Sequence, residues 1–168
     1  ARWVTGFFVN NVKVINTLQT GYYLSNCHDI HLTNFSADTV GQWSTSSDRN
    51  AISLHNADNS TTNTNSGTVN NFFFKTVGDE AITLSGARNV AISNGAVDGC
   101  DFGIEFTAAS TVTTQDCSFS NINFRNGIDF GITFNATVAD VARINFTNLN
   151  FGFHSTLHDA GVIYMSSS

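Results

Sequence analysis

Five acidic side chains recur at related positions of a repeated sequence and could carry acid–base chemistry. Asp79, Asp101 and Asp129 each lie two residues before the small residue that opens a predicted strand, and Glu80 and Glu105 lie close to them. Two carboxyl groups about 5–9.5 Å apart can hydrolyse a glycosidic bond, one by protonating the leaving oxygen and the other by activating water. We predict Asp79, Glu80 and Asp101 as the first catalytic candidates, with Glu105 and Asp129 as reserves.

These carboxyl groups can meet only if the repeats stack on one another. The repeat is clearest at residues 78–94, where two short strands, 81–84 and 89–93, alternate apolar and polar side chains as half-buried strands do. The first strand recurs at residues 21–24, 51–54, 103–106, 131–134 and 161–164. Units roughly 22–30 residues apart are typical of solenoids, so the acidic residues should form a line on one face.

The second strand of the unit recurs as well, and each copy ends in an asparagine. The shared turn position holds Asn71, Asn94, Asn121 and Asn148, with Asn16 and Asn34 in a looser fit. Asparagine tolerates a left-handed backbone, and stacked amides can hydrogen-bond from one unit to the next. We therefore expect an asparagine ladder that belongs to the scaffold and not to the site.

Composition supports an all-β fold. The 168 residues include no proline and 15 phenylalanines, 41% are hydrophobic, and no convincing amphipathic helix is present. A β-sandwich would have similar turns but no in-register repeat, so we predict a coil of parallel strands with about six rungs, in which residues 1–168 form a single domain. Neither end offers a polar capping helix, so we expect flanking segments or an oligomer to cover the ends of the coil.

Charge and hydropathy exclude some partners. The net charge is −6, and seven Lys and Arg residues form no basic stripe, which argues against nucleic acid. No apolar run is long enough for a membrane span. The three cysteines lack metal-type spacing, and Cys117 falls at an inward strand position as a buried free thiol. We assign no metal site.

Three further residues are candidates for substrate binding. Trp43 lies in an insertion, residues 38–49, and could stack on a sugar or simply cover its own loop. Lys75 and Arg125 align two rungs apart and could meet an acidic sugar, although solvated turn residues would have the same pattern. Phe102 and Phe130 follow Asp101 and Asp129 directly, and we favour a place in the core over an outward stack.

One short motif connects these repeats with known proteins. Gly78-Asp79-Glu80-Ala81-Ile82 resembles the Gly-Asp-Asp-Cys-Ile segment of polygalacturonases, whose paired aspartates belong to the catalytic acid and base set. The tandem units resemble the right-handed parallel β-helix of the pectin-lyase-like superfamily. Asp101-Phe102-Gly103 replaces the Gly-His-Gly of polygalacturonases, so the chain is closer in character to phage tailspikes, which share the coil without a fixed motif.

The resemblance implies a right-handed β-helix that recognises and cleaves a polysaccharide, as a trimer at a virion surface or in the extracellular space. Two alternatives remain open. The acids could hold Ca²⁺ while a basic residue abstracts a proton from a uronic acid, as in a polysaccharide lyase. The coil could also be a rigid rod for adhesion or assembly, in which case the acidic line is an exposed edge without chemistry.

Overall fold

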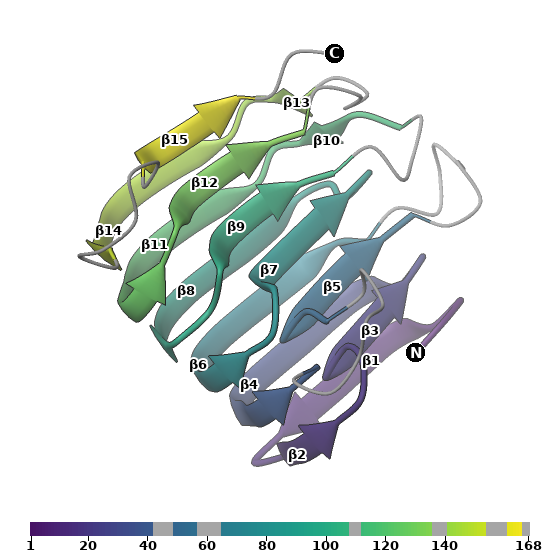
Figure 1. Cartoon of the computed structure of the whole chain (residues 1–168). Helices are drawn as coiled ribbons and strands as arrows, with labels where there is room; N and C mark the ends of the chain where they lie inside the picture. Colours follow the sequence, from purple (N-terminus) through teal and green to yellow (C-terminus); the bar gives the residue numbers. More distant parts are fainter. Residues whose placement is uncertain (42–48, 57–64, 108–111, 136–140, 154–160, 166–168) are drawn as a thin grey trace.

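The computed structural model describes residues 1–41, 49–56, 65–107, 112–135, 141–153 and 161–165. Within these ranges every regular element is a β-strand, and the strands stack in parallel into a coil (Figure 1). The predicted all-β parallel β-solenoid is therefore confirmed. The insertion that carries Trp43 falls largely outside the described residues.

One sheet is built from the first strand of each repeat. Its strands are β3 (Tyr22–Ser25), β5 (Ile52–His55), β7 (Glu80–Ser85), β9 (Phe102–Phe106), β12 (Phe130–Phe134) and β15 (Gly161–Met165), hydrogen-bonded in that order. Ile52, Ile82, Ile104 and Ile132 occupy one register position and are buried. Apolar residues thus hold this sheet on the core at each level.

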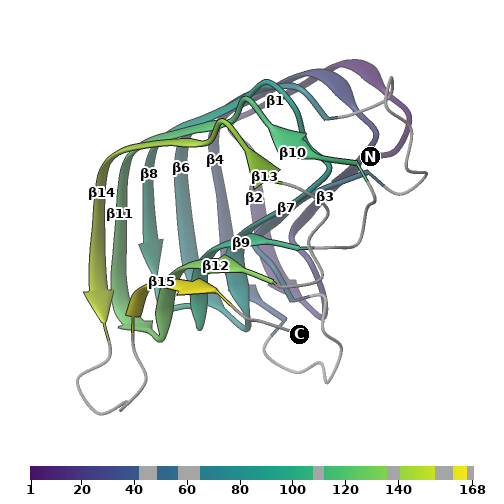
Figure 2. The same ribbon diagram turned by 90° about the horizontal axis from the view of Figure 1, so that it is seen from above.

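The longer strands form a seven-stranded sheet. It contains β1 (Thr5–Asn10), β2 (Lys13–Thr17), β4 (His28–Val40), β6 (Gly67–Val77), β8 (Val90–Asp98), β11 (Ser118–Ile128) and β14 (Asn145–Phe153); β1 and β2 pair with the two halves of β4. A third, two-stranded sheet pairs β10 (Thr114–Gln115) with β13 (Val141–Ala142). Seen along the stack, the long strands bend sharply part-way along their length (Figure 2).

The asparagine ladder is present and accounts for a backbone turn within each long strand. Positive φ angles between 51° and 55° occur at Asn34, Asn71, Asn94, Asn121 and Asn148. The Asn148 amide donates to Asn121 (2.8 Å), and Asn121 donates to Asn94 (3.2 Å). The Asn94 amide donates to Asn70 and not to Asn71. The acceptor on β6 is therefore one residue before the expected ladder position. Asparagine is suited to this position because its short side chain tolerates the left-handed region.

Two predicted alignments are wrong at the ends of the coil. Asn16 is outside the ladder because β2 pairs with the second half of β4; the first member is Asn10, which accepts from Asn34 at 3.1 Å. In β15, Ile163 faces Ile132, whereas matching residues 161–164 to 131–134 by their glycines predicts Val162 there. A one-residue slip exchanges the two faces of a strand, so glycine is a weaker guide to register than the buried apolar position.

Phenylalanine rings fill the interior, and some need glycine beside them. Phe35, Phe72 and Phe74 pack as one group, with ring centroids 4.7–6.0 Å apart. A Cβ atom on Gly95 would lie 2.0 Å from the Phe72 ring, so only glycine fits opposite this ring. Cys27, Cys100 and Cys117 are buried free thiols, as predicted for Cys117. The core thus runs continuously through the described rungs.

Candidate functional site

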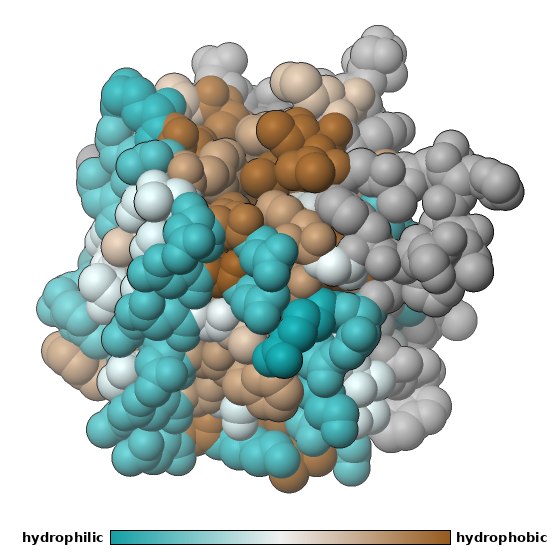
Figure 3. Space-filling view, turned by 90° about the vertical axis from the view of Figure 1, so that its left-hand side faces the viewer, coloured by the Kyte–Doolittle hydropathy of each residue, from teal (hydrophilic) through white to brown (hydrophobic). Residues whose placement is uncertain are grey.

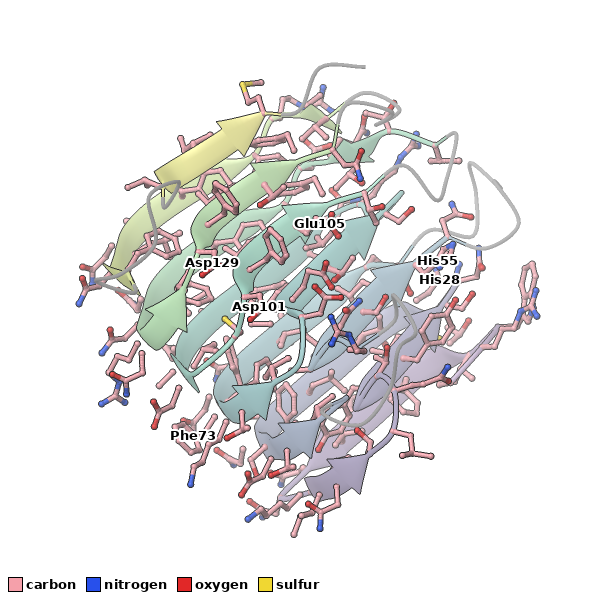
Figure 4. The ribbon with its side chains drawn as sticks, in the orientation of Figure 1. His28, His55, Phe73, Asp101, Glu105 and Asp129 are labelled. Carbon is pink, nitrogen blue, oxygen red and sulfur yellow. The ribbon has the colours of Figure 1, made fainter. Side chains whose placement is uncertain are left out.

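A polar cleft of about 400 Å³ lies on the outer face of the six-stranded sheet. All the residues that line it carry a polar side-chain atom, and three of them are the acidic residues Asp79, Glu80 and Glu105. Figure 4 shows Glu105 part-way along β9, while Asp101 and Asp129 lie toward the beginning of β9 and β12. The cleft therefore contains three of the five predicted acidic residues.

Strand register explains why these side chains meet. Ser53, Thr83, Glu105 and Thr133 occupy one position on four neighbouring strands, directly after the buried isoleucines. Because side chains alternate across a strand, this row faces away from the core. His55 and Ser85 form the next outward row on β5 and β7, and Tyr23 donates to or accepts from the His55 ring at 3.0 Å. Adjacent rungs thus build a continuous polar floor.

Glu80 is the most unusual acid of the cleft. It is only 8% exposed, and burial, followed by the charges of Glu105 and Asp79, raises its pKa from 4.5 to about 9. Its side chain also hydrogen-bonds with Asp79 and Glu105. Burial and the Asp79 charge raise the pKa of Glu105, and hydrogen bonds from Glu80 and Asn135 oppose this rise. Glu80 is therefore a neutral proton donor at pH 7, and it hydrogen-bonds with the carboxyl groups of Asp79 and Glu105.

Asp79 has a different environment because a guanidinium group lies beside it. Arg49 Nη2 is 3.3 Å from Asp79 Oδ2, and both side chains are mostly buried. Arg49 was missed as a site residue because it is the last residue of an insertion and has no counterpart in the repeat. Asp79 is thus ion-paired with Arg49 on one side and hydrogen-bonded with Glu80 on the other.

The predicted acidic line is confirmed in the backbone. The amide of Asp101 donates to the carbonyl of Asp79 at 3.0 Å, and that of Asp129 donates to the carbonyl of Asp101 at 2.9 Å. Burial, followed by the charges of Asp129 and Asp79, raises the pKa of Asp101, while Arg49 lowers it. Asp101 and Asp129 do not line the cleft itself, so they extend the negative charge along its border.

Phe102 and Phe130 form the outward stack and not the core pair that we favoured. Their ring centroids are 5.7 Å apart with planes 13° from parallel, and both residues are only partly buried. The reason lies in the start of each strand: Gly103 and Gly131 point inward, toward Phe124 and Phe151, so the preceding rings face out. The stack lies directly after the acidic line on the same two rungs.

Two of the three predicted binding residues, Lys75 and Arg125, do not line the cleft. Lys75 and Arg125 lie on the seven-stranded sheet, where both are in register with Asp98 of the strand between them. Lys13 and Asp38, 3.6 Å apart, continue the same alternation of charge. This arrangement favours a surface charge ladder for Lys75 and Arg125. Trp43 lies outside the described residues.

Three buried polar atoms in the cleft lack a partner. Asn50 Oδ1, Thr83 Oγ1 and Ser85 Oγ have no hydrogen bond, although these residues are at most 5% exposed. A buried polar atom left unpaired costs about 1–3 kcal/mol, so native proteins rarely keep several together. All three residues line the cleft, where a bound ligand could satisfy them.

No metal centre emerges from the described residues, which contain no group of three or more His, Cys, Asp or Glu side chains placed to hold an ion. His154 and His158, the pair with the most metal-like spacing, lie outside them. Calcium therefore stays a prediction of the lyase alternative. The described part of the chain also has no helix that could cross a membrane.

Comparison of the sequence with models of protein families and with curated proteins finds no match. The parallel β-solenoid is thus established by the structure, and the chemistry has to be argued from the cleft.

Proposed function

We propose that the protein binds a polysaccharide along its six-stranded sheet and hydrolyses a glycosidic bond in the cleft, as a member of the pectin-lyase-like superfamily acting outside the cell or on a virion surface. One observation carries the proposal: Glu80, a buried carboxyl group with a pKa of about 9, contacts the ion-paired carboxylate Asp79 in an open polar cleft. A fold gains nothing from such a pair, whereas acid–base catalysis needs one neutral and one ionised carboxyl group.

The two groups offer a proton donor and a proton acceptor for the two halves of glycoside hydrolysis, and the hydrogen bond between them must open so that the sugar and the attacking water fit between the carboxyl groups. Glu80 donates its proton to the glycosidic oxygen as the bond between that oxygen and the anomeric carbon breaks. Asp79 accepts a proton from the water whose oxygen attacks the anomeric carbon. One proton leaves Glu80 and one arrives on Asp79. Transfer of that proton from Asp79 to Glu80 restores the starting state. The charge of Glu105 raises the pKa of Glu80, and Asp101 adds negative charge at the border of the cleft.

The polar row on the cleft floor supports a carbohydrate as the ligand. Sugars present many hydroxyl groups, each both donor and acceptor, and the unpartnered atoms of Asn50, Thr83 and Ser85 require such groups. The partly exposed Phe102–Phe130 stack offers a flat apolar surface to the face of a sugar ring. Both features lie on one sheet, so an extended chain could reach them together.

The experiment is incubation with a panel of bacterial and plant polysaccharides, followed by mass spectrometry of the products. Oligosaccharides carrying an added water would support hydrolysis, and unsaturated ends would favour the lyase. No product from any substrate would favour the rod.

Variants then test the site. Glu80→Gln and Asp79→Asn should each lower kcat at least about 100-fold. Asp101→Asn should also lower turnover while leaving the thermal transition nearly unchanged. Asp116→Asn is the matched control, because this acid forms an exposed ion pair with Arg143 away from the cleft. Retained activity in both Glu80→Gln and Asp79→Asn would refute the assignment.

A further inference from the structure

The charge of the cleft limits which polysaccharide it can hold. Asp79 and Glu105 line it as acids beside the neutral Glu80, and Asp101 and Asp129 follow along its border. Among the described lining residues there is no Lys or Arg, and the neighbouring Arg49 is already paired with Asp79. A chain of uronic acids would bring further carboxylates into this field and would be repelled.

The hydrogen-bonding inventory points in the same direction. Asn50 Oδ1 is an acceptor, and the hydroxyl groups of Thr83 and Ser85 can accept as well as donate. Carboxylates add only acceptors. Among the unpartnered atoms of the described residues, only Arg49 Nε can donate without accepting, and Arg49 does not line the cleft. The unpartnered lining atoms are all oxygens, and they lie in one cleft with the carboxyl groups of Asp79 and Glu105, so a ligand rich in N–H donors would match them.

We propose that the substrate is an amino-sugar polysaccharide with free ammonium groups, one of which occupies the cleft beside Glu105 and Thr83. The inference rests on the proposed function and names its substrate class. Glu105 lies in register with Thr83 and Thr133, so its carboxylate lies beside hydroxyl groups that can accept from the same ammonium group. An ammonium group donates three hydrogen bonds and accepts none, which fits this row.

Such a cation would also help the acid that the mechanism uses. The pKa of Glu80 is raised partly by the negative charges of Glu105 and Asp79. An ammonium group among them offsets those charges and lowers this pKa from about 9 toward neutrality. A proton donor with a pKa near the working pH is the more effective one. Substrate binding would thus prepare the catalytic group, whereas a neutral or acidic sugar would not.

The test is binding by isothermal titration calorimetry at pH 6, with the intact chain and two probes. These are a hexamer of β-1,4-linked glucosamine and an oligomer of α-1,4-linked galactosamine, each compared with its own N-acetylated form and with oligogalacturonate. At least one amino oligomer should bind tenfold or more tightly than its acetylated form, and oligogalacturonate should not bind. Equal or weaker binding of both amino oligomers would overturn the proposal.

Variants separate a built site from general attraction to an acidic protein. Thr83→Val keeps both charge and size, and should weaken the amino oligomer about tenfold; Glu105→Gln should remove most of the preference for it. Asp116→Asn changes the net charge equally and should leave binding unchanged. If Thr83→Val and Glu105→Gln bind like wild type, or hexalysine binds as tightly as the sugar, the site assignment fails.

The two proposals can fail separately. Selective binding of the amino oligomer without cleavage would retain the substrate class and reject hydrolysis. Cleavage of a neutral or acidic polysaccharide that depends on Glu80, without amino-oligomer binding, would retain hydrolysis and reject the substrate class.

Discussion

Replacing Glu80 by glutamine should stabilise the fold at alkaline pH while it abolishes hydrolysis. The glutamine keeps a hydrogen-bond donor for Asp79 and Glu105 but cannot ionise. In the wild type, the folded protein holds a proton on Glu80 up to about pH 9, whereas the unfolded chain releases it near pH 4.5. The contribution of Glu80 to wild-type stability is therefore fully present below pH 4.5 and is lost progressively as the pH rises toward 9.

The size of the effect follows from this gap. At pH 7 the pH is about 2.5 units above the unfolded pKa, which corresponds to at most about 3 kcal/mol of lost stability. Partial screening in the open cleft should reduce this to roughly 1–2 kcal/mol. For a chain of this size, that equals a change in melting temperature of about 2–8 °C.

The assay is thermal unfolding followed by circular dichroism between pH 5 and pH 9, for wild type, Glu80→Gln and Asp116→Asn. The Glu80→Gln advantage should be small at pH 5 and increase to several degrees by pH 8, while Asp116→Asn should follow the wild-type pH dependence. A Glu80→Gln variant that melts at or below the wild-type temperature at pH 8 would refute the burial and charge argument, whatever its activity.

Three smaller predictions concern the scaffold. Asn121→Ala should cost about 1–3 kcal/mol in chemical denaturation, because alanine is strained at positive φ and the ladder loses two bonds, whereas Asn121→Gly should cost less. Gly95→Ala should cost more than about 2 kcal/mol or prevent folding, because its Cβ meets the Phe72 ring, while Ala96→Gly should be milder. Cys117, whose pKa burial raises to about 11, should resist thiol reagents at pH 8 until the protein unfolds.

Much of the fold could be predicted because stacking imposes a repeat on the sequence. The inward isoleucines and the turn asparagines each satisfy a local requirement once per rung, so they recur at one position. The register at the ends of the coil was predicted less well, because burial and turn geometry constrain the residue types less strictly there. In β15 both Val162 and Ile163 are exposed, so the apolar pattern no longer indicates which residue faces inward. Figure 3 shows apolar residues gathered toward the end where β14 and β15 lie.

The candidate site was predicted only where it follows the repeat. Asp79, Asp101 and Asp129 could be placed in a line because each precedes an equivalent strand. Arg49 could not, because it belongs to an insertion that has no counterpart in the repeat. The outward orientation of the Phe102 ring could not be predicted either, because it depends on Gly103 facing Phe124 across the core. The pKa of Glu80 depends on burial and on contacts between rungs, which a single strand does not reveal.

The cleft is where the chain departs from what folding alone would select. Ser53, Thr83 and Thr133 place hydroxyl groups at one register position, and Glu105 places a carboxyl group at the same position between the last two. A hydroxyl group there would serve the scaffold equally well and would relieve the charge on Glu80. Together with the unpartnered oxygens of Thr83 and Ser85, this acid makes the free protein less stable. A cationic sugar ligand would offset the charge around Glu80 and would also pair the free oxygens. Saturating amino oligomer should therefore raise the melting temperature of wild type more than that of Glu105→Gln.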